Sequence, residues 1–484
     1  MHSSRGDLVG RVLRLGRRVL PGGVKERLRW LYAGMPRSWQ MSSEYRALTA
    51  LLRESQWWSE ERLRDFQLQR LREVVRHAAE SVPGHARRFA EHGVGPEELR
   101  SLEDLRRFPT MGKEDLRGDP RDFLARGIPE ERLQLVTSGG TTGIPTAFYH
   151  LAQRNEEVTR AFRLAMWGRI GFSFERRILD LTASFGEPFG YVPQRRSLYV
   201  SISYLGRDGV DAWLDRARRF RPEYILGLPS TVVLLAQLLR ERGAVDDFRF
   251  RGVVAGSEVM YPWQREYISE TFGCRVLSWY GMAETAGFAA GCEHSDEFHF
   301  FPEAGVVELL DDGGSPVTRE GEEGEIVLTG FHTPATPFIR YRTGDRGVLG
   351  ARSCPRCGRN YPLLREIAGR RQEFLVAANG RRVPNSALNV HHDLFHEVRS
   401  YQFHQDTPGR VELRIVRGGG YLEATTAEVR EQMLRQLGAG FELEVRFVDD
   451  IPRTGRGKHR FIVQEIPAER LETGTVLASP NEKS

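Results

Sequence analysis

The sequence predicts an α/β fold: a large multi-layer N-terminal domain of β-sheets and helices, followed by a small α+β C-terminal domain. Two observations support this prediction. After Leu133, short apolar runs with strand character alternate with amphipathic helices, and several runs end in Gly or Ser. That pattern is typical of layered α/β sheets with functional sites at their strand ends. The last hundred residues or so combine strand-like stretches with one helix, as expected for a small separate domain.

The chain before Leu133 is predicted to be mainly helical. From about Ser43 to Arg107, stretches such as "LRDFQLQRLREVVRHAAESV" place apolar residues at helical spacing. Residues 1–42 form a basic, faintly amphipathic segment without the apolar core of a secretory signal. A surface helix is therefore favoured there over a membrane anchor.

The predicted strands follow in sequence order. The first group is "RLQLVTSG", "RRILDLTA", "PEYILGL", "RGVVAGSE" and "CRVLSWYG". After about Phe298, a β-rich part contains "GVVELLDD", "GEIVLTG" and "RGVLG". The last part contains the strands "RVELRIVRGGGY" and "FELEVRFVDD" and a helix near "TTAEVREQMLRQLGA". We therefore expect a basic segment at 1–42, a large domain at 43–370 and a small domain at 371–484.

Composition narrows the function classes. Apolar residues make up 40% and charged residues 28% of the chain, as in soluble globular proteins. No run of about 18 apolar residues exists, so we expect no integral membrane segment and place the protein in the cytoplasm. The 70 basic residues are nearly balanced by 65 acidic ones without a long basic block, so no nucleic-acid partner is expected.

The stretch "TSGGTTGIPT", residues 137–146, is rich in Gly, Ser and Thr and follows a predicted strand. Glycines allow successive backbone N–H groups to face an anion, and hydroxyls add further donors to phosphate oxygens. The loop lacks the GK[ST] ending of a Walker loop. By composition alone, a phosphate-binding loop and an ordinary surface turn are about equally favoured.

Four further motifs follow this loop in a fixed order: "YGMAE" at Tyr280–Glu284, "YRTGD" at Tyr341–Asp345, "GRRQE" at Gly369–Glu373 and "PRTGRGK" at Pro452–Lys458. The ordered set resembles the adenylate-forming superfamily of acyl-CoA synthetases, peptide-synthetase adenylation domains and luciferases. Within it the chain is most similar to the phenylacetate–CoA ligase branch and its CapK-like relatives. The segments "LEDLRRFPTMGKEDLR", "PEYILGLPSTVVLLAQLL" and "CPRCGR" also fit that branch.

The resemblance implies an ATP-dependent ligase that converts a carboxylic acid into an acyl-adenylate and releases pyrophosphate. The acyl group is then expected to pass to coenzyme A after the small domain, acting as a lid, rotates. Two alternatives stay open: an adenylyltransferase that leaves AMP on its product, and an inactive nucleotide-binding homologue. Members of this branch often form homodimers, and the sequence neither favours nor excludes one here.

The resemblance also assigns roles to individual residues. The β- and γ-phosphates of ATP would be held by Thr137, Ser138, Gly139, Gly140, Thr141, Thr142 and Gly143. The adenine would lie between the segments Gly256, Ser257, Glu258 and Tyr280, Gly281, Met282, Ala283. Glu284 would hold Mg²⁺, a cation that prefers carboxylate and phosphate oxygens. Asp345 would bind the ribose, Arg370 the ribose or phosphate, and Lys458 would bridge the reacting carboxylate and α-phosphate.

Two positions depart from the family pattern. Ala283 stands where the family usually has Thr, so one hydroxyl contact to the phosphates is missing. Gln372 and Glu373 replace the two acids that many relatives carry after the Arg at the hinge. A hinge needs backbone freedom more than one particular side chain, so Gln372 can still serve as one.

Three cysteines and a histidine form a second constellation. Cys354 and Cys357 have zinc-knuckle spacing in "CPRCGR". Some members of the branch bind a structural zinc with this pair together with an earlier Cys and His, which implies Cys292 and either His299, which fits slightly better, or His294. A structural Zn²⁺ is favoured over an empty reduced Cys pair. Cys274 is predicted to be an ordinary buried strand residue.

The acid-binding pocket is expected to be apolar and to suit an aryl or fatty acid. Its candidate lining residues are aromatic or small: Phe148, Phe185, Tyr204, Trp279 and Ala286. The same residue types also form plain protein cores, so the sequence does not identify the acid.

Overall fold

The computed structural model describes residues 41–138, 146–182, 187–201, 205, 210–370, 374–384, 398–418, 421–453 and 459–466. The chain splits into two compact units. The first comprises Met1–Arg176, Val192–Ser197 and Leu277–Glu366, and the second Arg177–Tyr191, Leu198–Val276 and Ile367–Ser484. Among the described residues, no helix has the length and apolar character needed to span a membrane.

Among the described residues the first unit has five α-helices, the first three of which lie in the stretch that the sequence predicted to be helical. They are α4 (Ser43–Ser55), α5 (Glu60–Ser81), α6 (Pro83–Glu91), α7 (Lys113–Arg117) and α8 (Ala152–Trp167). The side chains of Ser42 and Ser59 cap α4 and α5 by accepting hydrogen bonds from backbone N–H groups of the first turn. After Glu91 the predicted helical stretch continues only as the short 3₁₀ helices η1 (Pro96–Glu98) and η2 (Glu103–Arg107).

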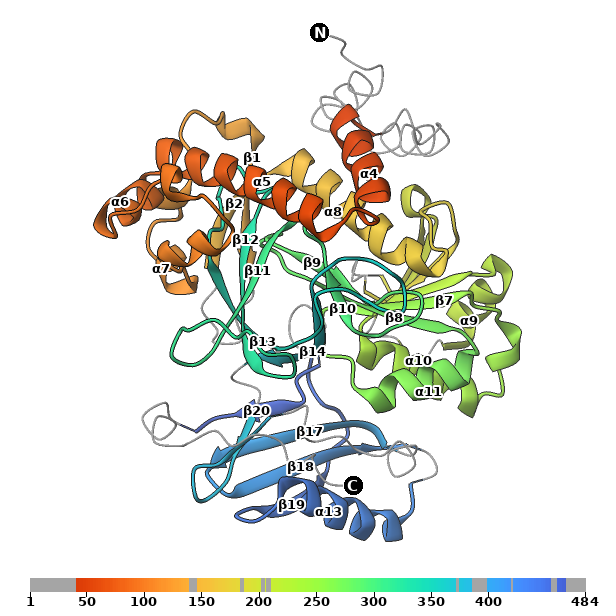
Figure 1. The fold of residues 1–484 in the computed structure, drawn as a ribbon. Helices are drawn as coiled ribbons and strands as arrows, with labels where there is room; N and C mark the ends of the chain where they lie inside the picture. Colours follow the sequence, from red (N-terminus) through yellow and green to blue (C-terminus); the bar gives the residue numbers. More distant parts are fainter. Residues whose placement is uncertain are drawn as a thin grey trace. The chain divides into compact units, whose positions relative to one another are not determined.

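The strands of the first unit form a mostly antiparallel array and a separate hairpin. The array runs in the order β11 (Gly305–Leu310), β12 (Glu323–Gly330), β13 (Tyr341–Leu349), β14 (Leu363–Arg370), β10 (Phe298–Phe300), β9 (Phe288–Ala290) and β8 (Arg275–Gly281). The hairpin pairs β1 (Leu133–Ser138) with β2 (Thr146–Leu151). Helix α5 lies across β11 and β12 (Figure 1), where Leu71 and Val75 pack with Val306 and Ile339.

The second unit contains three of the strands that the sequence predicted, and these three pair in parallel. Its order is β7 (Gly252–Gly256), β6 (Tyr224–Gly227), β3 (Ile178–Asp180), β5 (Ser197–Val200) and β4 (Phe189–Val192). The helices α9 (Val210–Phe220), α10 (Pro229–Glu241) and α11 (Pro262–Phe272) contribute to one apolar core with these strands. Because β3, β6 and β7 are parallel, their carboxyl ends meet at one edge, where sites form in α/β sheets.

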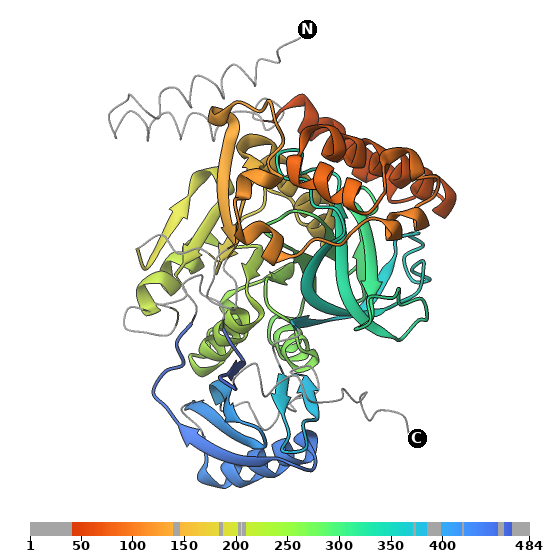
Figure 2. The same cartoon turned by 90° about the vertical axis from the view of Figure 1, so that its left-hand side faces the viewer.

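The C-terminal part of the second unit is α+β, as predicted. Its main sheet runs in the order β19 (Glu442–Phe447), β18 (Arg410–Arg417), β17 (Val398–Thr407) and β20 (Ile462–Gln464), beside a small pair, β15 (Phe374–Val376) and β16 (Arg382–Pro384). Helix α13 (Glu423–Leu437) covers one face of the main sheet (Figures 1 and 2). Since this part groups with Leu198–Val276, the expected boundary at Arg370 stays a prediction.

The remaining short helices connect these elements. They are η3 (Pro120–Phe123), η4 (Glu130–Arg132), η5 (Gly168–Ile170), η6 (Pro193–Arg195) and η8 (Val245–Asp247). Among them, η5 carries the buried residue Arg169 directly after α8.

Candidate active site and metal centre

The turn after β8 holds the "YGMAE" motif in one conformation. The N–H of Thr285 donates to the carbonyl of Met282 (3.1 Å). Thr285 has a φ of 52°, a left-handed conformation that costs a β-branched residue roughly 1–3 kcal/mol. Its hydroxyl donates to Asn155 Oδ1 (2.9 Å), which helps to hold this strained residue in place.

Strand β2 supports the same turn from the other side. His150 Nε2 donates to the carbonyl of Ala283 at 2.8 Å. Burial lowers the pKa of the His150 imidazole, so the ring is neutral and keeps one N–H for this bond. The hairpin that flanks the Gly/Thr-rich loop is thereby tied to the "YGMAE" turn.

A β-bulge sets the position of Asp345 in the "YRTGD" motif. The pairing of β12 with β13 shifts between Glu325 and Val327, so the residues Thr343 to Asp345 bulge out of the ladder. Gly344 has a φ of 76°, which a glycine adopts without a steric penalty. The Thr343 hydroxyl accepts the N–H of Asp345 (3.0 Å) and donates to the carbonyl of Ile326 (2.7 Å).

The two motifs bond to each other reciprocally. Tyr280 donates its phenol to Asp345 Oδ2 (2.8 Å), and Tyr341 donates its phenol to Glu284 Oε1 (2.9 Å). Burial, followed by the nearby charge of Asp345, raises the pKa of Tyr280 well above its usual value, so the phenol stays protonated. Each carboxylate is therefore oriented by the tyrosine of the other motif.

Glu258 occupies the carboxyl edge of the parallel strands in the second unit. It follows β7 and Ser257, which has a φ of 68°. Its Oε2 accepts the N–H of Ser230 at the start of α10 (3.2 Å), and its Oε1 accepts the N–H of His459 (2.7 Å). Arg453 donates to the Ser230 hydroxyl (3.0 Å). Glu258 thus connects α10 to the residue that directly follows Lys458.

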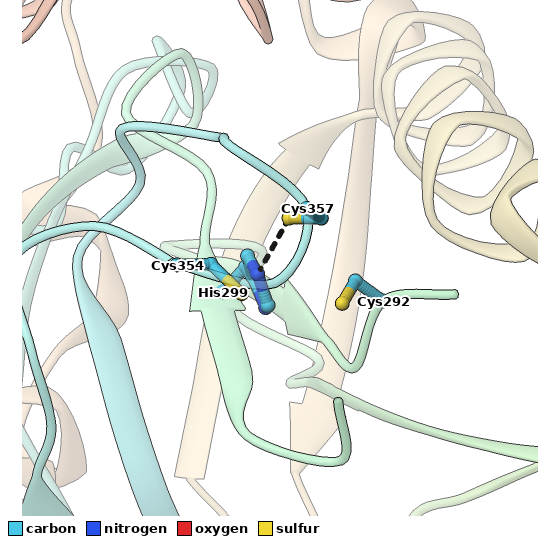
Figure 3. A group of neighbouring side chains, drawn as sticks. All are labelled: Cys292, His299, Cys354 and Cys357. Atoms are coloured by element: carbon cyan, nitrogen blue, oxygen red, sulfur yellow. Dashed lines mark hydrogen bonds between the residues drawn. The ribbon is translucent and has the colours of Figure 1, made fainter. Parts of the chain in front are cut away.

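Three cysteines and one histidine converge in the first unit (Figure 3). The ligand atoms of Cys292, His299, Cys354 and Cys357 all lie within 4.8 Å of one another, and Cys357 Sγ is 3.4 Å from His299 Nε2. Cys292 follows β9, His299 belongs to β10, and the Cys pair lies between β13 and β14. The group joins the consecutive strands β9 and β10 to a loop that is distant in sequence.

The surroundings of this group suit a tetrahedral metal ion. His299 donates its Nδ1–H to the carbonyl of Glu297 (2.9 Å), which leaves Nε2 as the ligand atom. Burial lowers the pKa of His299 to about 3, so the imidazole is neutral. Cys292 Sγ accepts the N–H groups of His294 (3.4 Å) and Ser295 (3.2 Å), as thiolate ligands do. Three thiolates and one imidazole match a closed structural zinc site.

Of the two histidines that the sequence left open, the geometry brings His299 into this group. His299 is buried, whereas His294 is exposed and contributes its backbone N–H. Sequence reasoning did not single out His150 or the phenol of Tyr341. The only signals for them were the alternation of β2 and the position of Tyr341 at the head of its motif.

Comparisons with known proteins identify the family. Residues 196–333 match the family model of AMP-binding enzymes, and residues 375–465 match the CapK C-terminal domain. Phenylacetate–coenzyme A ligase of Pseudomonas putida is 31% identical over 69% of this chain and 77% of its own length. The corresponding ligase of Thermus thermophilus is 30% identical over 78% and 84%.

The chain belongs to the phenylacetate–coenzyme A ligase family. A solved structure of 2-hydroxyisobutyryl-CoA ligase in the postadenylation state has the same fold, with a TM-score of 0.68 at 21% identity, covering 84% of this chain and 90% of that one. The α/β fold and the adenylate-forming superfamily predicted from the sequence are thereby confirmed.

Several residues expected from the ligase family lie outside the described part of the chain. They are Gly139, Gly140, Thr141, Thr142, Gly143, Phe185, Tyr204, Gln372, Glu373 and Lys458. Thr137 and Ser138 end β1 directly before the loop, Gly256 ends β7, and Arg370 ends β14. These assignments stay predictions.

The described candidates for the acid pocket differ in exposure. Phe148 is fully buried and packs edge-on against Phe338, with ring centroids 5.4 Å apart. Ala286 is also buried. Trp279 is half-buried beside Trp167, with centroids 5.8 Å apart, and is therefore the described candidate with the most accessible ring.

Proposed function

We propose that this protein activates a carboxylic acid with ATP and transfers the acyl group to coenzyme A. A carboxylate oxygen of the acid attacks the α-phosphorus, and the bond to the leaving pyrophosphate breaks. The coenzyme A sulfur then attacks the acyl carbon, its thiol proton is lost to solvent or base, and AMP leaves. Membership of the phenylacetate–coenzyme A ligase family supports this two-step reaction.

The observation that supports this proposal best is the pair of hydrogen bonds between the "YGMAE" and "YRTGD" motifs, the two central motifs. Tyr280 and Asp345 are held together at 2.8 Å, as a pair that binds adenine and ribose requires. Tyr341 and Glu284 are held together at 2.9 Å. Such fixed groups need no reorganisation when charge develops in the transition state.

Two metal ions complete the proposal. Glu284 is buried, its Oε1 accepts one hydrogen bond, and its Oε2 makes none within the described residues, so Oε2 would serve as a Mg²⁺ ligand. Mg²⁺ would offset the negative charge of the phosphates when bound. Cys292, His299, Cys354 and Cys357 would hold a structural Zn²⁺, with no position left open for substrate.

Lys458 would neutralise the two anions that approach each other during adenylation. Its role rests on its place in the "PRTGRGK" motif, since Lys458 lies outside the described residues. The neighbouring His459 is held by Glu258 and, through its Nε2, by the carbonyl of Tyr401 (2.7 Å).

The deciding experiment is pyrophosphate release with ATP, Mg²⁺ and a panel of aryl and fatty acids, with and without coenzyme A. We expect acid-dependent release in the wild type, and a loss of about a hundredfold or more in Lys458→Ala. Lys483→Ala is the matched control, since it also removes one lysine but lies outside every motif. Equal rates in Lys458→Ala and Lys483→Ala would contradict the proposed role of Lys458.

The products separate the ligase from the alternatives. A thioester that forms only with coenzyme A supports the proposed acceptor. A stable AMP adduct without thioester would instead show an adenylyltransferase. An absence of ATP binding by calorimetry would show an inactive homologue and overturn the proposal.

A further inference from the structure

Arg169 is a buried cation for which the described residues provide no ion-pair partner. It lies in η5, directly after α8, and is 8% exposed. Its Nη1 donates to the carbonyls of Ala290 (3.2 Å) and Gly291 (2.9 Å), whereas Nε and Nη2 have no hydrogen-bond partner. Within the described residues it forms no ion pair with a carboxylate. Burial of an unpaired charge costs several kcal/mol, so a compensating negative charge is expected nearby.

Aromatic rings offset only part of this cost. The Arg169 guanidinium lies 4.9 Å from the ring centre of Phe301 and 5.9 Å from that of Tyr361. A cation over an aromatic face gains on the order of 0.5–2 kcal/mol, which is less than the cost of burial. The ring faces carry no net charge and leave the guanidinium uncompensated.

Arg169 lies beside the group of four potential metal ligands, Cys292, His299, Cys354 and Cys357. The two carbonyls that accept its N–H groups belong to the residues directly before Cys292. Burial and then the neighbouring charge of Arg359 lower the pKa of the Arg169 guanidinium, whereas Glu293 and Cys357 act in the opposite direction. A second arginine, Arg359, is 3% exposed and forms a bidentate ion pair with Glu293 (2.7 and 2.8 Å).

Loss of the thiol protons to a bound metal would balance the charges of the two arginines and Glu293. Arg169, Arg359 and Glu293 together carry one net positive charge. A divalent ion bound by three thiolates and one neutral imidazole carries one net negative charge, and its binding releases three thiol protons. The two sets therefore neutralise each other inside the protein.

We propose that Arg169 and Arg359 form a cationic shell that stabilises an anionic three-thiolate metal centre at Cys292, His299, Cys354 and Cys357. This inference rests on the proposed zinc site and adds two charged residues to it: Arg169 from η5, and Arg359 from the same loop as Cys357. Both are positioning residues, because they act on the metal through its ligands. Such outer-shell groups typically change metal affinity by about 10- to 100-fold.

A buried carboxyl group, that of Glu303, is an alternative to the metal centre as the negative charge that compensates Arg169. Glu303 is 1% exposed, and burial raises its pKa. It accepts hydrogen bonds from Ser55 and from the phenol of Tyr361 (2.7 Å) and forms none with Arg169. If Glu303 compensated Arg169, removal of its charge would alter metal binding as strongly as removal of Arg169.

The test measures Zn²⁺ affinity of the full chain by chelator competition, with Co²⁺ absorption as a second probe of thiolate ligation. We expect Arg169→Met to weaken binding by about tenfold or more, and Arg169→Lys by less because it keeps the charge. Arg160→Met is the matched control, since Arg160 lies in the preceding helix α8 and its guanidinium also lies over an aromatic ring, that of Phe174 at 4.3 Å. Arg160→Met and Glu303→Gln are expected to stay within about twofold of the wild type.

A second set of variants tests charge without touching Arg169, in case Arg169→Met does not fold. Arg359→Gln removes one positive charge and is expected to weaken Zn²⁺ binding. The double variant Arg359→Gln/Glu293→Gln keeps the net charge and is expected to recover most of the affinity. Equal losses in the single and double variants would show packing rather than charge and overturn the inference.

The outcomes also separate this inference from the zinc site itself. A wild type that binds neither Zn²⁺ nor Co²⁺ overturns both. A wild type that binds Zn²⁺ with an affinity unchanged in Arg169→Met overturns only the cationic shell. A change in Glu303→Gln as large as that in Arg169→Met assigns the counter-charge to Glu303 and likewise rejects the shell.

Discussion

At the residue scale, each acid of the two central motifs is held by a tyrosine of the other. The sequence predicted Tyr280, Glu284 and Asp345 as binding residues, but it did not predict that they bond across motifs. The hydrogen bond between Tyr280 and Asp345 depends on the bulge at Thr343 to Asp345, because the bulge changes the direction of the Asp345 side chain. A bulge arises from the pairing of two strands, so the sequence of one strand indicates it only through a glycine, here Gly344.

Tyr280→Phe removes the phenol that orients Asp345. One hydrogen bond to a charged group contributes about 1.5–3 kcal/mol, so we expect the KM for ATP to rise by roughly tenfold or more. Steady-state pyrophosphate release at varied ATP measures this change. The control is Tyr191→Phe, because Tyr191 is 37% exposed and belongs to no motif. An unchanged KM in Tyr280→Phe would mean that the pair does not contact the nucleotide.

Glu284→Gln tests the proposed Mg²⁺ ligand. Glutamine retains an oxygen that accepts the Tyr341 phenol, so folding is expected to be preserved while the negative charge is lost. We expect the rate to fall by about a hundredfold at fixed Mg²⁺ and the Mg²⁺ requirement to rise. Glu297→Gln serves as the control. A Mg²⁺ titration that superimposes on that of the wild type would reject Glu284 as a ligand.

At the element scale, the sequence located about half of the described strands but did not show which side chains would meet between them. The Cys pair was visible from its spacing, whereas the choice between His299 and His294 was not. His299 lies in β10, paired with Ala290 of β9, and so faces the segment that carries Cys292. His294 lies in the turn between the two strands. Pairing register, which a single sequence does not reveal, decides the ligand set.

Cys354→Ala is expected to abolish stoichiometric zinc binding and to lower the melting temperature by several degrees, because the metal would join β9, β10 and the β13–β14 loop. Metal content by mass spectrometry and thermal unfolding measure the two effects. Cys274→Ala is the matched control, since Cys274 is a free cysteine outside the group. Equal zinc content in the two variants would contradict the site.

Glu258→Ala removes the carboxylate that accepts two backbone N–H groups from different elements. We expect faster hydrogen exchange in the peptides that contain Ser230 and His459, since both amides lose their acceptor. Glu266→Ala, on the exposed face of α11, provides the control. Unchanged protection at both amides in Glu258→Ala would show that other contacts hold the residue after Lys458.

At the scale of the whole molecule, the α/β class followed from local patterns, but the composition of the two compact units did not. Each unit is assembled from three separate stretches of the chain. Hydrophobic periodicity indicates which face of a helix or strand is buried. It does not indicate which distant segment covers that face. The helix α5 was predicted from its spacing, for example, while its packing against β11 was not.

Buried neutral histidines make the whole fold sensitive to acid. Burial lowers the pKa of His85, His332 and His459 to about 4, against 6.5 for an exposed histidine. Between pH 6.5 and 4 the unfolded chain binds more protons, so stability falls as pH falls and is unaffected by these groups above pH 6.5. At pH 5 each group contributes a loss of roughly 2 kcal/mol.

His332→Gln tests this linkage, because glutamine can still donate to the carbonyl of Glu303, as His332 does at 2.9 Å. We expect the urea midpoint of the variant to fall less than that of the wild type between pH 7.5 and 5. His92→Gln, which changes an exposed histidine, should follow the wild type. Parallel pH profiles for all three proteins would show that His332 titrates normally in the folded state.

The contact between α5 and β11 also has a consequence for biosynthesis. Gln67 donates to the carbonyl of Gly305 (2.7 Å) across 238 residues of chain. At about 5–20 residues per second, a ribosome needs roughly 10–50 s to add that length. During this interval the apolar face of α5, with Leu71, Val75 and Ala78, has emerged without the strand that later covers it. We therefore expect a holdase chaperone to bind this helix on the nascent chain before β11 is synthesised.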